Sequence, residues 1–158
     1  MSGISEWDRL MASLLHGGMV PERTYTISNG ETPYITRTLF PRVGPMRPML
    51  HQIHRADADE ALHNHPWRTA TSLILSGGYT EERLVGDEKV QFTYGPGDVN
   101  RLDAGTFHRI SAIEPNTWTM LVVGERMQSW GFLVPGEGFV ESSAYFARTG
   151  HADLGGNS

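Results

Sequence analysis

The stretch Leu62-His63-Asn64-His65-Pro66-Trp67 is the most informative part of this 158-residue sequence. On a β-strand, residues two apart point to the same face and lie roughly 7 Å from each other. His63 and His65 are therefore placed to bind one metal ion together. A pair of unliganded surface or core histidines explains this spacing equally well, so the pair alone does not decide between the two interpretations.

A third histidine strengthens the metal interpretation. The turn sequences Gly95-Pro96-Gly97 and Asp103-Ala104-Gly105 bracket a short predicted strand, and His108 follows the second turn. In an antiparallel barrel such a strand can lie beside the His63–His65 segment. We therefore expect His108 to reach the same interior face as the pair, while Asp103 is expected to stabilise the turn.

Most of the remaining chain alternates between β-favouring runs and Gly, Pro, Asn or Asp turns, which indicates a sandwich or barrel. No stretch between the predicted strands is long enough for a helical crossover. The predicted strands are Tyr34–Phe40, Met49–His54, Leu62–His65, Thr69–Ser76, Tyr79–Leu84, Lys89–Tyr94, Asp98–Leu102, Phe107–Ile113, Trp118–Val123 and Trp130–Val134.

The predicted domain organisation is simple. Residues 1–30 are interpreted as a short amphipathic N-terminal helix, beginning near Ser5, followed by a connecting loop from Pro21 to Gly30. Residues 31–148 are expected to form one β-barrel domain, and residues 149–158 to be a disordered tail. The length of the chain agrees with a single domain.

Composition excludes several classes of protein. The chain has no cysteine, which excludes disulfides, thiolate zinc sites and cysteine nucleophiles, but it has seven histidines. Eighteen glycines and nine prolines favour a turn-rich fold. The net charge of −5 argues against nucleic acid as a partner. Without an apolar run of membrane-spanning length or a signal-peptide pattern, we expect no membrane association and a cytoplasmic location.

The two histidine motifs resemble those of the cupin superfamily. His63, His65 and Gly77 match the first cupin motif, and Gly97, Gly105 and His108 match the second. The His-x-His-Pro-Trp run is also similar to a group of small, uncharacterised bacterial and phage cupins. The resemblance implies an all-β, cupin-type double-stranded β-helix, that is, a jelly-roll barrel.

The sequence departs from the cupin motifs at the position of a usual metal ligand. The glutamate of the first motif falls on Thr69 or Ala70, and neither can supply a carboxylate. The resemblance then implies a metal shell of three neutral imidazoles, from His63, His65 and His108. Such a shell leaves positions open for water or substrate, as catalytic sites do. Whether another protein ligand replaces the missing glutamate stays open.

We therefore expect one divalent metal ion per chain. Cupins of the thiol-dioxygenase type also use three histidines, which favours Fe(II). Nitrogen ligands also suit Zn, Ni and Cu, and Mn is a further alternative, so the residues themselves do not select the metal.

Other residues near the motifs are weaker candidates. Trp67, Arg68 and Thr69 are candidates for substrate binding, with core packing as the competing role for Trp67 and an outward, solvated position as that for Arg68. His54 and Tyr79 are candidates for acid–base chemistry. His51 and His54 are three residues apart and are expected on opposite faces of a strand.

These expectations lead to three functional hypotheses. The first is an Fe(II)-dependent dioxygenase acting on a small polar molecule inside the barrel. The second is a cupin that binds or senses a ligand without catalysis, and the third is a metal-assisted isomerase or lyase. A small-molecule substrate is the expected partner, and homodimerisation is possible.

Overall fold

The computed structural model describes residues 16–150. In it, strands with alternating apolar and polar residues form two antiparallel sheets. The first sheet has the spatial order β1 (Arg23–Asn29), β2 (Thr32–Leu39), β3 (Arg47–Ile53), β10 (Thr117–Val123), β5 (Thr69–Ser76) and β8 (Val99–Asp103). The second has the order β12 (Gly138–Glu141), β11 (Gly131–Val134), β4 (Leu62–His63), β9 (His108–Ile113), β6 (Tyr79–Val85) and β7 (Glu88–Tyr94).

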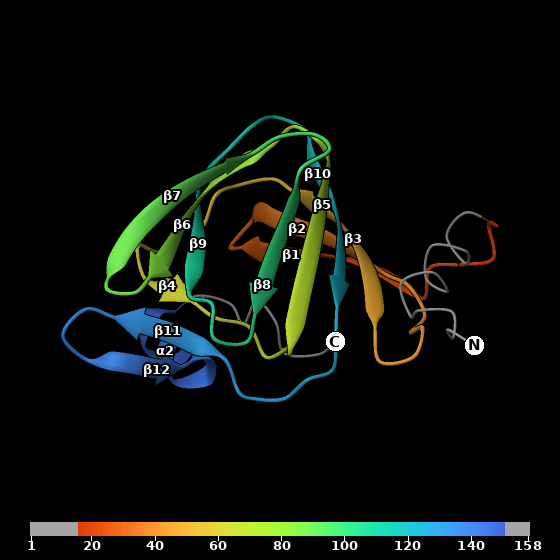
Figure 1. The fold of residues 1–158 in the computed structure, drawn as a ribbon. Coiled ribbons are helices and arrows are strands. Elements are labelled where there is room, and N and C mark those ends of the chain that lie inside the picture. The colour runs from red at the N-terminus through yellow and green to blue at the C-terminus, as the bar shows by residue number, and fades with distance from the viewer. Residues whose placement is uncertain (1–15, 151–158) are drawn as a thin grey trace.

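The two sheets enclose a common interior, as Figure 1 shows. Chain neighbours are often in different sheets: β4 and β5 lie in opposite sheets, and so do β8 and β9. This crossing between sheets is typical of a jelly roll. The all-β class and the jelly-roll architecture predicted from the sequence are therefore confirmed, and all ten predicted strands occur with small differences at their ends.

Three elements were not anticipated. The interpretation of residues 21–30 as a loop is wrong, because Arg23–Asn29 forms β1 and pairs along its length with β2. The chain near the C-terminus forms the extra strand β12 and the helix α2 (Ser142–Thr149), so Thr149 belongs to a helix rather than to a tail. Gly150 ends this helix as its C-cap. The predicted N-terminal helix and residues 151–158 of the predicted tail lie outside the described residues.

Helix α2 packs against the end of the second sheet, beside β11 and β12 (Figure 1). Tyr145 stacks on Phe132 of β11 with ring centroids 4.0 Å apart, and Phe146 and Trp130 complete this aromatic cluster. In a second buried cluster, Trp67 packs with four apolar residues of the first sheet, Leu39, Met49, Ala70 and Val123. Among the described residues, no helix is long and apolar enough to cross a membrane.

Candidate metal centre

The register between β4 and β9 brings two of the three histidines together. His63 and His108 are directly opposite each other in this antiparallel pair, and His65 follows two residues after His63. Each ring centroid lies between 4.9 and 5.1 Å from the other two. One potential ligand atom from each ring lies within 4.8 Å of the others. The structure thus brings together the three histidines that the sequence predicts.

Side chains outside the motifs hold the two histidine segments in place. Asn64 lies between His63 and His65 and is buried. Its side-chain oxygen accepts a hydrogen bond from the backbone amide of Gly131 at 2.9 Å, and its backbone amide donates to the carbonyl of Gly131 at 3.1 Å. The Gln128 side chain donates to the carbonyl of His65 at 2.9 Å and to that of Ala104 at 2.6 Å. Gln128 therefore joins the His65 segment to the turn that precedes His108.

The turn before His108 is stabilised as the sequence predicts. The Asp103 carboxylate accepts hydrogen bonds from the amide of Gly105 at 2.9 Å and from the hydroxyl of Thr106 at 3.0 Å. An aspartate that accepts bonds from residues two and three positions later is a common turn device. It sets the direction in which the chain enters β9, and hence the position of His108.

A buried glutamate lies behind His108. Oε1 of Glu81, on β6, is 3.3 Å from His108 Nδ1 and also accepts a hydrogen bond from Arg83 Nε at 2.7 Å. Its other oxygen accepts from Asn100. The contact with His108 is close enough for a charge interaction but is not aligned as a hydrogen bond. Burial raises the pKa of Glu81, yet His108 and Arg83 outweigh it and leave this pKa below its usual value.

The environment of the histidines favours their neutral, ligating form. Burial, with a further contribution from His108, lowers the pKa of His63 to about 4 despite the opposing charge of Asp57. Burial and then the neighbouring His108 and His63 lower the pKa of His65 well below its usual value. A metal binds the neutral imidazole, so both rings have their lone pairs available at neutral pH.

The distance between the ring nitrogens of His65 and His108 fits a shared divalent metal. His65 Nε2 and His108 Nε2 lie 2.9 Å apart. Two imidazole nitrogens bound to one ion at 2.0–2.1 Å, at right angles, would be about 3.0 Å apart. Neutral imidazoles are common ligands of transition metals. The three histidines therefore form a suitable site for one divalent metal ion.

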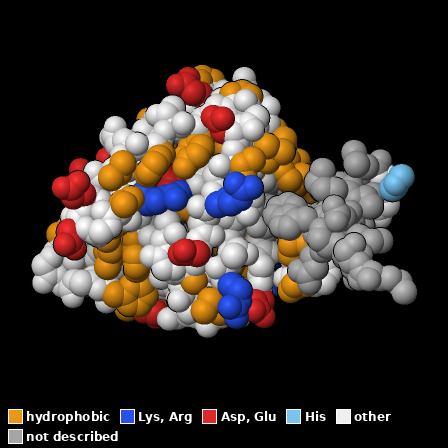
Figure 2. Space-filling view, in the orientation of Figure 1, with side chains coloured by type: hydrophobic (Ala, Val, Ile, Leu, Met, Phe, Trp, Pro, Cys, Tyr) orange, Lys and Arg blue, Asp and Glu red, His pale blue; other side chains and the backbone are white. Residues whose placement is uncertain are grey.

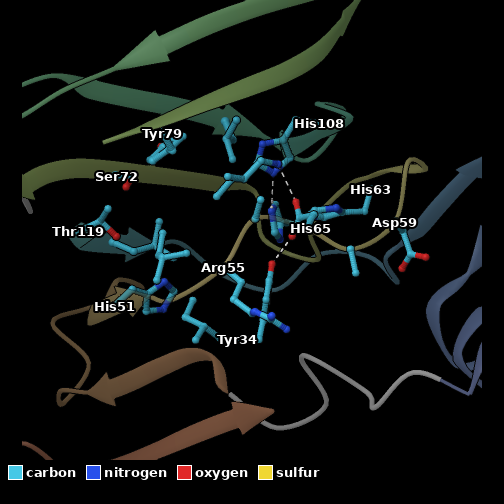
Figure 3. A pocket seen from close by; sticks show the side chains of 18 of the residues that line it. Tyr34, His51, Arg55, Asp59, His63, His65, Ser72, Tyr79, His108 and Thr119 are labelled. Carbon is cyan, nitrogen blue, oxygen red and sulfur yellow. Dashed lines mark hydrogen bonds between the residues drawn. The ribbon is translucent and has the colours of Figure 1, made fainter. Parts of the chain in front are cut away.

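The three histidines lie on the wall of an interior cavity of about 460 Å³, which Figure 3 shows from close by. Such a volume is within the usual range for small-molecule sites. Most of the lining is apolar, and it includes Ile35, Ile53, Leu102, Ile110, Leu121, Trp130 and Phe132. In Figure 3, His51, Thr119 and Ser72 lie on one side of the cavity and His63 on the other.

The predicted substrate-binding residues separate into two groups. Trp67 is buried, lines the cavity and stacks on His65 at 5.4 Å between ring centroids. Arg68 and Thr69 do not line the cavity. The Arg68 side chain is 62% exposed and pairs with Glu125 at 2.7 Å. It points away from the cavity because consecutive residues of an extended chain point to opposite faces, and Trp67 points inward. We therefore do not retain Arg68 and Thr69 in the site.

The two predicted acid–base candidates also differ in position. His54 is exposed and hydrogen-bonds to the Thr36 hydroxyl at 2.8 Å, outside the cavity, so its assignment is wrong. His51 is buried and lines the cavity, which confirms that the two histidines face opposite ways. Tyr79 lines the cavity and accepts a hydrogen bond from Asn100 at 3.0 Å. Burial raises the pKa of Tyr79 to about 12.

Sequence reasoning missed several polar groups of the cavity wall, among them the pair Tyr34 and Asp57, and Arg37. Tyr34 donates a hydrogen bond to Asp57, whose second oxygen accepts from the amide of Ile110 at 2.7 Å. Arg37 lies on the interior face of β2 between Ile35 and Leu39. The alternation of this strand was a signal that could have placed Arg37 inside the barrel.

Comparison with known proteins establishes the fold but no closer relationship. No protein-family model matches the sequence, and no curated protein matches it. The crystal structure of FeII HppE matches with a TM-score of 0.52 and 11% identity, over 65% of this chain and 55% of that chain. Streptomyces PAC13 with uridine matches with a TM-score of 0.50 and 15% identity, over 75% of this chain and 88% of that chain.

KdgF from Halomonas sp. is a third match, with a TM-score of 0.45 and 18% identity over 65% of this chain and 90% of that chain. The match to HppE covers just over half the length of the HppE chain. HppE and PAC13 are cupin-fold proteins, so the comparison shows that this chain has the cupin fold that its histidine motifs resemble.

Proposed function

We propose that this protein is a metal-dependent enzyme, and specifically an Fe(II)-dependent dioxygenase that acts on a small polar molecule in the barrel interior. The observation that carries the proposal is the convergence of three imidazoles on the wall of a cavity. Among the described residues, no carboxylate joins this group. A metal held there would keep positions free for substrate, as catalytic sites require.

The protein's own groups would bind and orient the reactants. His63, His65 and His108 would hold the metal, and Fe(II) would supply the redox chemistry that lets an organic substrate react with O₂. Trp67 keeps the His65 ring in place by stacking on it. The apolar lining limits the access of water to the reacting groups.

The preference for iron has two supports. Cupins of the thiol-dioxygenase type, which this site resembles, use three histidines, and the structurally similar HppE has been crystallised with FeII. Zn, Ni and Cu are also compatible with a shell of nitrogen ligands. The first test is therefore elemental analysis of protein purified without chelator, followed by O₂-uptake measurements with a panel of small polar substrates.

A pair of variants makes this test specific. His63→Ala should abolish both metal binding and turnover, whereas His16→Ala, which changes an exposed histidine, should affect neither. Near one iron per chain together with O₂ uptake would support the proposal. Zinc or nickel without O₂ uptake would favour an isomerase or lyase, and metal-free protein would leave the non-catalytic binding module as the remaining hypothesis.

We also propose that the protein forms a homodimer and is located in the cytoplasm. Strand β1 is the edge of the first sheet and could pair with a second copy. Leu73, Leu75 and Val99 are exposed on the outer face of β5 and β8, and Figure 2 shows hydrophobic side chains across the upper part of this face. Sedimentation velocity of the full chain distinguishes dimer from monomer.

A further inference from the structure

One row of polar side chains crosses the apolar interior of the first sheet. Arg37 of β2 is opposite His51 of β3, and His51 is opposite Thr119 of β10. All three are buried and line the cavity. The flanking rows on these strands are mainly apolar, with Ile35 and Ile53 on one side. Buried polar groups are costly unless they are paired, so this row calls for an explanation.

The guanidinium of Arg37 has hydrogen bonds but no counter-charge. Its Nε donates to His51 Nε2 at 3.0 Å, and its Nη1 donates to the Tyr25 hydroxyl at 3.4 Å. Among residues 16–150, no carboxylate forms an ion pair with it. Arg37 is only 9% exposed. Burial of an uncompensated cation is strongly unfavourable, and proteins normally pair such a charge.

Neither of the two residues that accept hydrogen bonds from Arg37 carries a negative charge. His51 accepts from Arg37 through Nε2, so its proton is on Nδ1 and the ring is neutral. Burial, and then the charge of Arg37, lower the pKa of His51 well below its usual value. Asp57, which also lines the cavity, is already engaged by Tyr34 and by the amide of Ile110. Arg55, Asp57 and Asp59 also line the cavity, and hydrogen bonds from neutral donors leave the charge of Asp57 in place. None of the ion pairs formed by the described residues includes Arg37, so its charge has no directly paired carboxylate.

The hydrogen bonds of Arg37 leave its Nη2 group without an acceptor among the described residues. A guanidinium binds a carboxylate through its planar set of N–H donors. Next to this charged end the cavity wall is apolar and aromatic. A ligand that complements both parts has an anionic head and an apolar body.

We propose that Arg37 binds the carboxylate of a small organic acid, whose apolar part extends along the cavity toward the three histidines. This proposal rests on the proposed function in one respect, because it identifies the acid as the substrate of the metal centre. The anion site itself needs only Arg37 and the cavity. The two proposals can therefore fail independently.

The experiment compares two probes that differ only in charge at the head group, phenylacetate and phenylacetamide. Their affinities are measured by isothermal titration calorimetry for metal-loaded and for chelator-treated protein. We expect phenylacetate to bind about tenfold more tightly than the amide in both forms, as loss of a charge-assisted hydrogen bond costs at least that factor. Equal affinities for the two probes would overturn the proposal.

Variants locate the preference at Arg37. Arg37→Met should remove the preference for the carboxylate and leave the affinity for phenylacetamide within twofold. The matched control is Arg23→Met, because Arg23 also lies over the Tyr25 ring, at 4.8 Å, but is exposed. This control should keep the full preference. A preference that survives in Arg37→Met, or one found only in metal-loaded protein, would assign carboxylate binding to another group.

If Arg37 served only to stabilise the fold, Arg37→Met would lower the melting temperature. Since Arg37→Met removes an unpaired buried charge, we expect its melting temperature not to fall below that of the natural protein. If this variant does not fold, Arg37→Lys decides, since it keeps the charge. The lysine variant should still prefer the carboxylate, and its failure to do so would contradict the proposal. Metal content, measured separately, tests the metal centre alone.

Discussion

Glu81 lies directly behind His108, with its Oε1 atom 3.3 Å from His108 Nδ1 and its side chain fully buried. A carboxylate that accepts the second N–H of a ligating imidazole orients the ring and increases its basicity, and Glu81 is close enough to His108 to do so after a small rotation of either side chain. We predict that Glu81→Gln weakens metal binding by roughly 10- to 100-fold, the usual effect of removing such a partner. Titration with Co²⁺ or Zn²⁺ against a competing chelator measures this change.

Glu82→Gln is the matched control for the Glu81 prediction. Glu82 is the next residue on β6, but it points to the other face and pairs with Arg109 at 2.8 Å. Its replacement should leave metal affinity unchanged. Equal metal affinity in Glu81→Gln and the natural protein would show that Glu81 only supports the packing of Arg83 and Asn100.

Asn64 provides a second prediction, on the stability of the segment between the paired histidines. Its side chain is buried and accepts the hydrogen bond from the amide of Gly131. Asn64→Ala leaves that buried amide without its partner, which costs about 1–3 kcal/mol of unfolding free energy. Urea denaturation measures the loss. Because this segment carries His63 and His65, metal affinity should also fall, and a fully stable variant with unchanged metal affinity would contradict the prediction.

Much of the metal centre could be predicted because its signal is local. The spacing of His63 and His65 places both on one face, and the turn at Asp103 directs the chain toward His108. The strands were predictable for the same reason, since alternation and turn residues are read over a few positions. These features need no knowledge of which strands pair.

The remaining parts of the site depend on pairing that the sequence does not reveal. Glu81 reaches His108 because β6 pairs with β9, and Gln128 links two segments that are distant in the chain. Helix α2 is short, and it is stabilised by packing of Tyr145 on Phe132 rather than by a strong helical signal of its own. Polar residues surround the few apolar residues of β1, so its sequence did not indicate a strand. Its pairing with β2 stabilises it.

Two glycines in turns give a prediction that separates backbone strain from crowding. Gly77 and Gly86 have nearly the same positive φ, 66° and 62°. A Cβ at Gly77 would lie 2.4 Å from Thr117 Oγ1 and 2.7 Å from Thr117 Cα, whereas at Gly86 it would meet nothing within 4 Å. Gly86→Ala should cost about 1–2 kcal/mol from the left-handed backbone alone.

Gly77→Ala should cost more, at least about 3 kcal/mol, because the clash with Thr117 adds to the same backbone strain. Chemical denaturation of both variants under one set of conditions provides the comparison. Equal losses of stability would mean that Thr117 moves aside without cost. In that case the glycine of the first histidine motif would be needed only for its conformation.

His51 gives a prediction on pH dependence. Burial and the adjacent Arg37 lower the pKa of His51 in the folded protein, whereas in the unfolded chain it is about 6.5. Between these two values the unfolded state binds the additional proton, so stability increases with pH in that range. The contribution of His51 is fully present above about pH 6.5 and is lost progressively as the pH falls toward the lower, folded-state pKa.

His51→Asn tests this contribution, because asparagine can still accept the hydrogen bond from Arg37 but does not titrate. The unfolding free energy of metal-loaded protein, measured from pH 7.5 to 5, should fall less steeply in His51→Asn than in the natural protein. His54→Asn, which changes an exposed histidine just beyond β3, is the matched control variant. If the slopes for His51→Asn and the natural protein coincide, His51 binds protons equally in the folded and unfolded states, and burial beside Arg37 does not lower its pKa.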